Sequence, residues 1–191
     1  SSQCNGDIDA ILFKQVVKSV AARRKLTATF MAKPFGLQSS NGFHVHCSLL
    51  DKDGNNVFDN GSEEGSDILR HAVAGLLETM SDCTLLFAPH VNSYLVCSAV
   101  LVGMLYGIEN KLEAPEPVNS ITYNEAELKT LPLDWLSTIR KFESSDIIDS
   151  LFPSEMIELL IAVKKQEAKR FAQQVTNLEY LTYLQDVWYV K

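Results

Sequence analysis

Polar and apolar residues alternate along residues 43–49, and this pattern constrains the fold more than any other feature. His44, His46 and Ser48 alternate with apolar neighbours, which are Phe43, Val45, Cys47 and Leu49. Successive side chains of an extended strand point to opposite faces, so the three polar side chains share one face. Apolar packing on the other face would fix the rotation of the strand. The resulting polar row suits a metal or phosphate site.

Residues on both sides of this pattern also favour extended structure. Residues 26–31 (LTATFM) are rich in strand-forming residues, and Pro34 ends that strand because proline lacks a backbone donor. Residues 51–56 (DKDGNN) are dense in residues that tolerate positive φ. With residues 57–58 beyond this turn, they predict a hairpin that follows a strand over 42–50.

Helical spacing of apolar residues accounts for most of the remaining chain. It predicts helices over residues 7–25, 66–80, 95–109, 133–143, 153–174 and 175–189. The helix over 95–109 is apolar nearly all round, which predicts a buried helix at the centre of a helical layer. Strands come early and helices late, so the predicted fold class is α+β, an antiparallel sheet covered by helices within one domain over residues 1–191.

Composition argues against several classes of partner. The 191 residues carry a net charge of −7 with no basic block, whereas nucleic acids and anionic membranes are bound through clustered Lys and Arg. The longest apolar stretch, residues 95–108, is too short to span a bilayer. The four cysteines stand far apart, which is typical of reduced thiols. We therefore expect a cytoplasmic protein with no nucleic-acid or membrane partner.

Each candidate site residue also has a structural interpretation. A lone histidine such as His44 is more often a hydrogen-bonded surface residue, but His46 two positions later raises the weight of a functional role. Lys33 before Pro34 is either a strand terminator or an ATP contact. Asn41 and Gly42 form either a simple turn or a close backbone approach to a ligand. The sequence offers no partner at useful spacing for His71 or His90, which favours structural roles for both.

Residues 33–48 (KPFGLQSSNGFHVHCS) resemble the ATP-binding signature of the glutamine synthetase superfamily. That signature runs from Lys-Pro and an apolar residue, through a turn of small residues, to His, three residues and Ser. Here it corresponds to Lys33, Pro34 and Phe35, then Asn41, Gly42, His44 and Ser48. Residues 85–94 and 94–112 and the carboxyl-terminal helices carry further similarity. The sequence of these segments is most similar to the branch that includes γ-glutamylpolyamine synthetases.

The resemblance implies an ATP-dependent ligase that requires Mg²⁺ or Mn²⁺. In this family the γ-carboxylate of glutamate attacks ATP, and ammonia or an amine then displaces phosphate from γ-glutamyl phosphate. By position, the resemblance implies that His44 ligates metal, and that Lys33, His46 and Ser48 bind ATP. Asn41 and Gly42 would line the glutamate pocket. Members of the family form homo-oligomers of stacked rings with active sites between subunits.

The chain also departs from the family pattern. Ser39 and Ser40 replace the usual turn residues, and the expected arginines and catalytic glutamate are missing between Tyr94 and Leu95. A similar jump follows Cys4. Either these segments are deleted, or they belong to a longer protein that this sequence represents in part. The second explanation is favoured because the breaks fall on active-site segments. The first would leave a catalytically inactive structural or interaction module.

Overall fold

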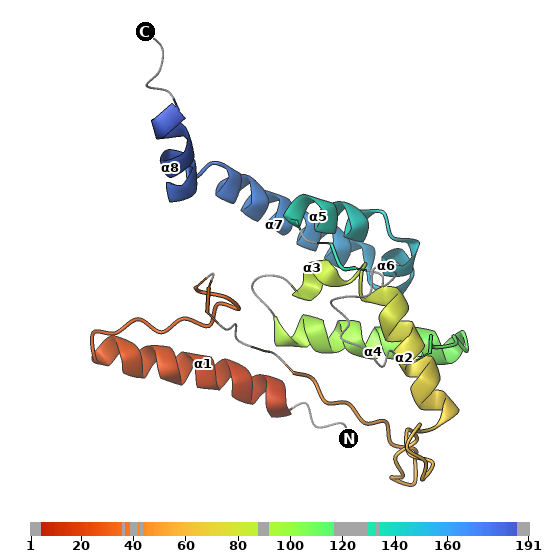
Figure 1. Cartoon of the computed structure of the whole chain (residues 1–191). Helices are drawn as coiled ribbons and strands as arrows, with labels where there is room; N and C mark the ends of the chain where they lie inside the picture. The colour runs from red at the N-terminus through yellow and green to blue at the C-terminus, as the bar shows by residue number, and fades with distance from the viewer. Residues whose placement is uncertain are drawn as a thin grey trace. The chain divides into compact units, whose positions relative to one another are not determined.

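The chain, seen in a computed structural model, forms helices over most of the residues that the structure describes. These residues are 5–35, 37–38, 42, 44–87, 92–116, 130–132 and 134–186. In chain order, as coloured in Figure 1, the helices are α1 (Asn5–Arg23), α2 (Asp67–Thr79), α3 (Thr84–Phe87), α4 (Ser93–Glu109), α5 (Trp135–Glu143), α6 (Asp146–Leu151), α7 (Ser154–Ala172) and α8 (Asn177–Asp186). They belong to two units, residues 1–129 and 130–191.

The predicted antiparallel sheet is wrong. Among the described residues no strand forms, and the β pairing there amounts to an isolated antiparallel bridge between Leu50 and Asn56. A strand satisfies its backbone groups by pairing with another strand, and the described parts of 26–31 and 42–50 are assigned to no strand pair. The described fold is therefore mostly helical rather than α+β.

The turn after the motif nevertheless closes where the sequence predicts it. The amide of Asp51 donates to the carbonyl of Asn55 at 2.9 Å, and the amide of Val57 donates to the carbonyl of Leu49 at 2.9 Å. Gly54 lies in this turn with φ +87, a conformation that side chains rarely adopt. The expected hairpin is thus reduced to its turn and one bridge.

Glycines set the packing of the first unit, where α2 and α4 make close contact (Figure 1). A Cβ atom added to Gly107 would lie 2.6 Å from the amide nitrogen of Gly75 and would also overlap the carbonyl oxygen of His71. A Cβ on Gly103 would lie 2.6 Å from Oγ1 of Thr79, whose hydroxyl donates to the carbonyl of Gly75 at 2.9 Å. The two backbones can approach this closely only because no side chains stand between them.

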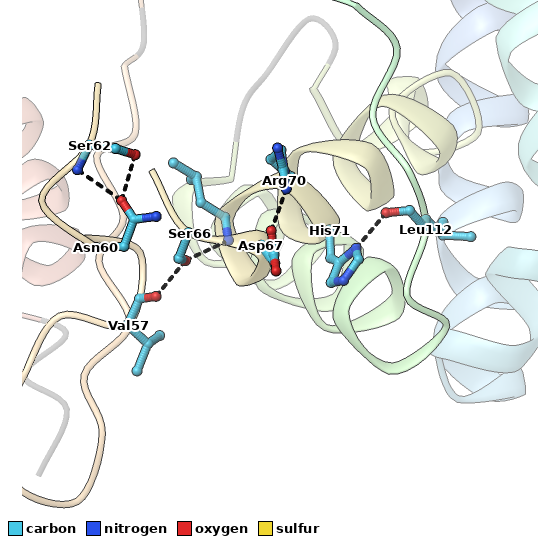
Figure 2. A network of polar contacts seen from close by, with 9 residues as sticks. Val57, Asn60, Ser62, Ser66, Asp67, Arg70, His71 and Leu112 are labelled. Carbon is cyan, nitrogen blue, oxygen red and sulfur yellow. Dashed lines mark hydrogen bonds and ion pairs between the residues drawn. The ribbon is translucent and has the colours of Figure 1, made fainter. Parts of the chain in front are cut away.

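A small apolar cluster covers one end of this helix pair. Phe58, Ala72 and Met104 are buried, and the half-buried Leu49 and Val57 pack against them. Ser66, the N-cap of α2, joins the preceding loop to the helix: its hydroxyl donates to the carbonyl of Val57 at 2.6 Å and accepts from the amide of Leu69 at 3.2 Å (Figure 2). The end of the motif is thereby attached to α2 and α4.

A Schellman-type turn ends α4. Lys111 takes a positive φ of 49, and the amide of Leu112 donates to the carbonyl of Gly107 at 3.0 Å. The carbonyl of Leu112 then accepts a hydrogen bond from Nδ1 of His71 at 2.8 Å (Figure 2). This bond links α2 to the end of α4 and fixes the Nδ1–H tautomer, which agrees with a structural role for His71.

The second unit packs α5 and α6 against α7. Ile139, Phe142 and Ile148 are almost completely buried in it. Trp135 and Phe171 place their ring centroids 5.3 Å apart, and Lys165 of α7 forms an ion pair with Glu143 of α5 at 2.6 Å. The described side chains of α8 are exposed.

The predicted helices are found with shifts of a few residues at their ends. Helix α6 is not among the helices predicted from the sequence; Ser145 provides its N-cap by accepting from the amide of Ile148. Helix α4 buries one face only, because Leu101 and Leu105 are 44% and 49% exposed. The described helices include none that is both long and apolar enough to cross a membrane.

Candidate functional site

The first part of the motif lies on the surface. Lys33 is exposed, Pro34 is half-buried, and Phe35 is 66% exposed. The residues that join this part to the histidines include Ser39, Ser40 and Asn41, which lie outside the described residues. The predicted contact of Lys33 with ATP and the predicted role of Asn41 therefore stay predictions.

Gly42 and His44 are brought together by the structure. A Cβ atom added to Gly42 would lie 2.9 Å from Nε2 of His44 and 3.3 Å from Cδ2. The imidazole therefore folds back over the glycine, and a side chain at position 42 would have to displace it. This contact gives a local reason for glycine at a position where the sequence alone left two interpretations open.

The alternation along the motif is reproduced in part. The side chains of His44, His46 and Ser48 are exposed, whereas Val45 and Leu49 are half-buried. Leu49 packs against the apolar cluster, as an inward-facing residue should. Cys47 departs from the pattern because it is exposed. The polar row is thus accessible, with its carboxyl-terminal end anchored through Leu49.

The carboxylate of Asp51, the first after the motif, forms hydrogen bonds within its own turn. Oδ1 of Asp51 accepts from the amides of Asp53 at 2.8 Å and Asn55 at 2.9 Å, and Oδ2 accepts from the side-chain amide of Asn55 at 3.0 Å. The side chain of Asn55 contributes most to lowering the pKa of Asp51, followed by these backbone donors. Asp51 therefore stabilises the turn and is an unsuitable partner for a metal held by His44.

A metal site needs several ligands, and the described residues supply too few. Within the described ranges, no group of three or more His, Cys, Asp or Glu side chains is placed to hold a metal ion. Imidazole binds divalent metals together with other ligands that complete the shell. His44 can contribute one ligand, so the described residues alone do not fit a complete metal centre.

The interruption expected after Tyr94 falls inside a continuous helix. The side chain of Asn92 caps α4 by accepting from the amide of Tyr94 at 3.0 Å, and the helix runs from Ser93 to Glu109. Ser93 and Val96 on either side of the junction are both buried. The joined sequence is therefore compatible with regular helix. His90, which the sequence assigned to no site, lies outside the described residues.

Comparison with characterised proteins identifies the family. The family model described as "Glutamine synthetase, catalytic domain" matches residues 6–95 and 91–183. Glutamate–isopropylamine ligase from a Pseudomonas species is 28% identical, with 92% of this chain and 50% of that protein covered. Gamma-glutamylputrescine synthetase PuuA from Escherichia coli K12 is 24% identical, with 90% of this chain and 46% of that protein covered. The chain thus spans about half the length of these relatives.

The alignments also show that internal positions are absent. The alignment with the isopropylamine ligase covers 230 positions, yet 92% of 191 residues is only about 176, so about fifty positions of that relative have no counterpart here. The two segments matched by the family model overlap at residues 91–95. That overlap includes the start of α4.

The fold has a close counterpart among solved structures. A structure titled "Apo GmaS without ligand" superimposes with a TM-score of 0.83 at 24% identity, covering 93% of this chain and 53% of that one. A second structure, titled "GmaS/ADP complex-Conformation 1", gives a TM-score of 0.81. The predicted family is confirmed: because the family model accounts for most of the sequence, this chain belongs to the glutamine synthetase superfamily and carries sequence of its catalytic domain.

Proposed function

We propose that the intact protein is an ATP-dependent ligase that joins the γ-carboxyl group of glutamate to ammonia or a small amine through γ-glutamyl phosphate. The family match over residues 6–183, which includes the motif, carries this proposal. The names of two relatives support the same chemistry, since one is a glutamate–isopropylamine ligase and another a gamma-glutamylputrescine synthetase. A glutamine synthetase from Sulfolobus acidocaldarius is 27% identical, so the proposal includes ammonia as well as amines as the acceptor.

The motif residues receive roles by their positions. His44 is one ligand of a divalent ion, Mg²⁺ or Mn²⁺, and His46 contacts a phosphate of ATP. Lys33 and Ser48 are further nucleotide contacts. Exposure of all four side chains supports these roles, because a bound nucleotide must reach them. A bound divalent ion would neutralise charge on the transferring phosphoryl group.

Asn41 and Gly42 line the glutamate pocket in this proposal. The contact between Gly42 and the imidazole of His44 supports it, because the turn and the metal ligand are then neighbours. Residues beyond the described set must supply the other metal ligands and the cationic side chains that bind phosphate and glutamate. The active site is therefore completed either by a longer form of this protein or by neighbouring subunits of a ring.

The proposal extends to organisation and location. Residues 1–191 belong to one interrupted catalytic domain, and intact chains assemble into stacked rings. Among the described residues, the thiols of Cys47 and Cys83 form no disulfide, which supports a reducing compartment such as the cytoplasm.

An activity assay tests the proposal directly. Full-length protein, purified from its native gene, is incubated with ATP, Mg²⁺, glutamate and in turn ammonia or one of a panel of small amines, and ADP release is measured. We expect ADP release that depends on both glutamate and one acceptor. Absence of ADP release with every acceptor would reject the ligase.

Two variants connect the activity to the motif. His44→Ala should abolish both ADP release and Mn²⁺ binding measured by electron paramagnetic resonance. Cys47→Ala provides the matched control, because Cys47 is an exposed motif residue with no assigned role, and its activity should be unchanged. Unchanged Mn²⁺ affinity of His44→Ala would contradict the ligand assignment.

A second candidate function is a catalytically inactive homologue that acts as a structural or interaction module. The about fifty absent positions and the continuous helix α4 favour it. The intact mass of the native protein separates the two candidates. A mass near 21.3 kDa without ADP release would favour the inactive module, and a mass about twice as large would favour the ligase.

A further inference from the structure

An Asn-Gly pair lies at the tip of the loop that precedes α2. The loop covers residues 59–65, and the amide of Ser66 closes its base by donating to the carbonyl of Phe58 at 3.0 Å. Asn60 and Gly61 are exposed at the tip. Gly61 has a φ of +80, and a Cβ atom added to it would have no neighbour within 4 Å. The backbone between Asn60 and Gly61 is therefore open to solvent and uncrowded.

Two donors hold the side-chain oxygen of Asn60. Its Oδ1 accepts from the amide of Ser62 at 3.0 Å and from the hydroxyl of Ser62 at 2.7 Å (Figure 2). Both bonds withdraw electron density from the side-chain carbonyl and would stabilise negative charge on Oδ1 while a nucleophile adds to Cγ. Asn60 is thus held as an activated amide, with its carbonyl carbon as the electrophile.

A carboxylate contacts the backbone nitrogen that can act as the nucleophile. The amide of Gly61 donates to Oδ1 of Asp59 at 2.8 Å. A carboxylate within hydrogen-bond distance of an attacking group can accept its proton. Attack of this nitrogen on Cγ of Asn60 closes a five-membered ring, so the reacting groups are joined in one short stretch of chain and need no collision. Base, nucleophile, electrophile and oxyanion donors all belong to residues 59–62.

We propose that Asn60 is a site of self-catalysed deamidation, in which Asp59 is the base and Ser62 stabilises the developing oxyanion. The nitrogen of Gly61 forms a bond to Cγ of Asn60 and gives its proton to Asp59. The bond between Cγ and Nδ2 then breaks, and Nδ2 takes that proton and leaves as ammonia. Water opens the resulting succinimide at either carbonyl, which gives aspartate or isoaspartate at position 60. The reaction uses no nucleotide or metal, so the proposal is independent of ligase activity.

The modification changes the charge and the backbone of the loop. A carboxylate at position 60 adds one negative charge to a chain whose net charge is already −7, and it lies beside Asp59. Isoaspartate also lengthens the backbone of the loop by one methylene group. The hydrogen bond between Ser66 and Phe58 at the base of the loop contains none of the reacting groups. We therefore expect α2 and α4 to stay folded after the reaction.

Asn56 provides an internal control. Its Oδ1 accepts from the amide of Phe58 at 3.1 Å, so its side chain forms the same kind of turn as that of Asn60. The next nitrogen, however, belongs to the β-branched Val57 and donates to the carbonyl of Leu49 at 2.9 Å. When the native full-length protein is kept at mildly alkaline pH, we expect Asn60 to lose ammonia at least about tenfold faster than Asn56. Peptide mapping by mass spectrometry measures both rates, and equal rates would overturn the proposal.

Asp59→Ser tests the base. A serine hydroxyl can still accept from the amide of Gly61 but takes up no proton, so we expect deamidation of the folded protein to slow about tenfold. In a free peptide of residues 56–66 the loop is no longer held closed, and the same substitution should change the rate less than about twofold. An unchanged rate in the folded protein, or an equal loss of rate in the peptide, would remove Asp59 as a base positioned by the fold.

Ser62→Ala and Ser62→Thr test the oxyanion donor. Alanine removes the hydroxyl and leaves the backbone amide, so we expect deamidation at Asn60 to slow about tenfold. Threonine keeps a hydroxyl at the same position and should keep the rate within about twofold of the native rate. Circular dichroism should show the native helical signal in both variants, since Ser62 is exposed. Equal rates in the alanine and threonine variants would contradict the role of the hydroxyl.

Discussion

The helical core (α2, α3 and α4, residues 67–109) and the motif segment (residues 26–50) differ in how their backbone hydrogen-bonding groups can be satisfied. Helices satisfy their backbone groups internally, and α2 and α4 then need only each other to bury Gly75, Gly103 and Gly107. The sequence predicts strands in the motif segment, and the backbone groups of a strand must find partners in other strands. Among the described residues its β pairing is reduced to the bridge at Leu50.

This difference relates to the positions missing from the chain. About fifty positions of a relative have no counterpart, and the overlap of the matched segments includes the start of α4. The helical core tolerates this change, since Asn92 caps a continuous helix there. Among its described residues, the motif segment retains its histidines on the surface and packs against the cluster in the core through Leu49, near its carboxyl-terminal end. A pair of helices thus depends less on other segments for its backbone hydrogen bonds than a strand does.

Thiol reactivity should show the largest contrast between the two regions. Cys83 in the core is 2% exposed, and burial, with a smaller contribution from Asp82, raises the pKa of its thiol to about 12, whereas Cys47 in the motif segment is exposed. At pH 8 we expect Cys47 to react with iodoacetamide about a thousandfold faster than Cys83, because the thiolate is the nucleophile. Peptide mapping by mass spectrometry measures both rates.

Denaturant provides the control, since both thiols should then react at similar rates. Equal labelling of both cysteines in the native protein would show that the core is open.

The raised pKa of Cys83 also has a consequence for stability. Unfolded chains lose the thiol proton above the ordinary pKa of 9.0, while the folded protein keeps it up to about pH 12. The free energy of unfolding should therefore fall as pH rises from 9.0 toward 12.

Gly107→Ala should give the largest loss of stability. Its Cβ would overlap backbone atoms of α2 at His71 and Gly75, so the helices would have to separate. We expect the free energy of unfolding to fall by about 3 kcal/mol, measured by urea denaturation with circular dichroism. Ser98→Ala on the exposed side of α4 is the control and should change it by less than about 0.5 kcal/mol. Tolerance of alanine at 107 would contradict the close packing of α2 and α4.

Leu49→Ala measures how strongly the motif segment is anchored to the core. Leu49 packs against the cluster of Phe58, Ala72 and Met104, but it is only half-buried, so we expect a loss of about 1 kcal/mol. The neighbouring Leu50 is 64% exposed and serves as the matched control, with an expected change below about 0.5 kcal/mol. Similar losses for both variants would mean that the anchor is not specific to Leu49.

The sequence predicts local features of this chain better than its sheet. Ser66 as a helix start and the turn at residues 51–56 were both predicted correctly, because capping and turn formation depend on neighbouring residues. Within the described residues 44–49, the alternation agrees with the half-buried Leu49 and the exposed histidines but is wrong for Cys47, which is exposed. The alternation does not reveal whether a partner strand exists, because the partner would be a different segment of the sequence.

Tertiary contacts account for what the sequence could not predict. The carbonyl partner of His71 belongs to Leu112, forty-one residues away, and becomes available only after Lys111 ends α4. The fold of His44 over Gly42 depends on a side-chain conformation that residue types do not specify. The roles of His44, His46 and Ser48 stay predictions, because their chemistry needs groups beyond the described residues.

Asp51→Ala should have the smallest effect and tests the turn that follows the motif. Its carboxylate accepts from two backbone amides and from the side chain of Asn55, and these bonds lower its pKa below 3.8. The turn should therefore be fully supported above that value and should loosen as pH falls through the lowered pKa. We expect faster amide hydrogen exchange at Asn55 in the variant, followed by NMR, with Asp53→Ala as the exposed control. Since the turn is exposed, global unfolding should barely change. An Asp51 titration midpoint at or above 3.8 would mean that the motif segment lacks even this local support, and that its order comes from Leu49 alone.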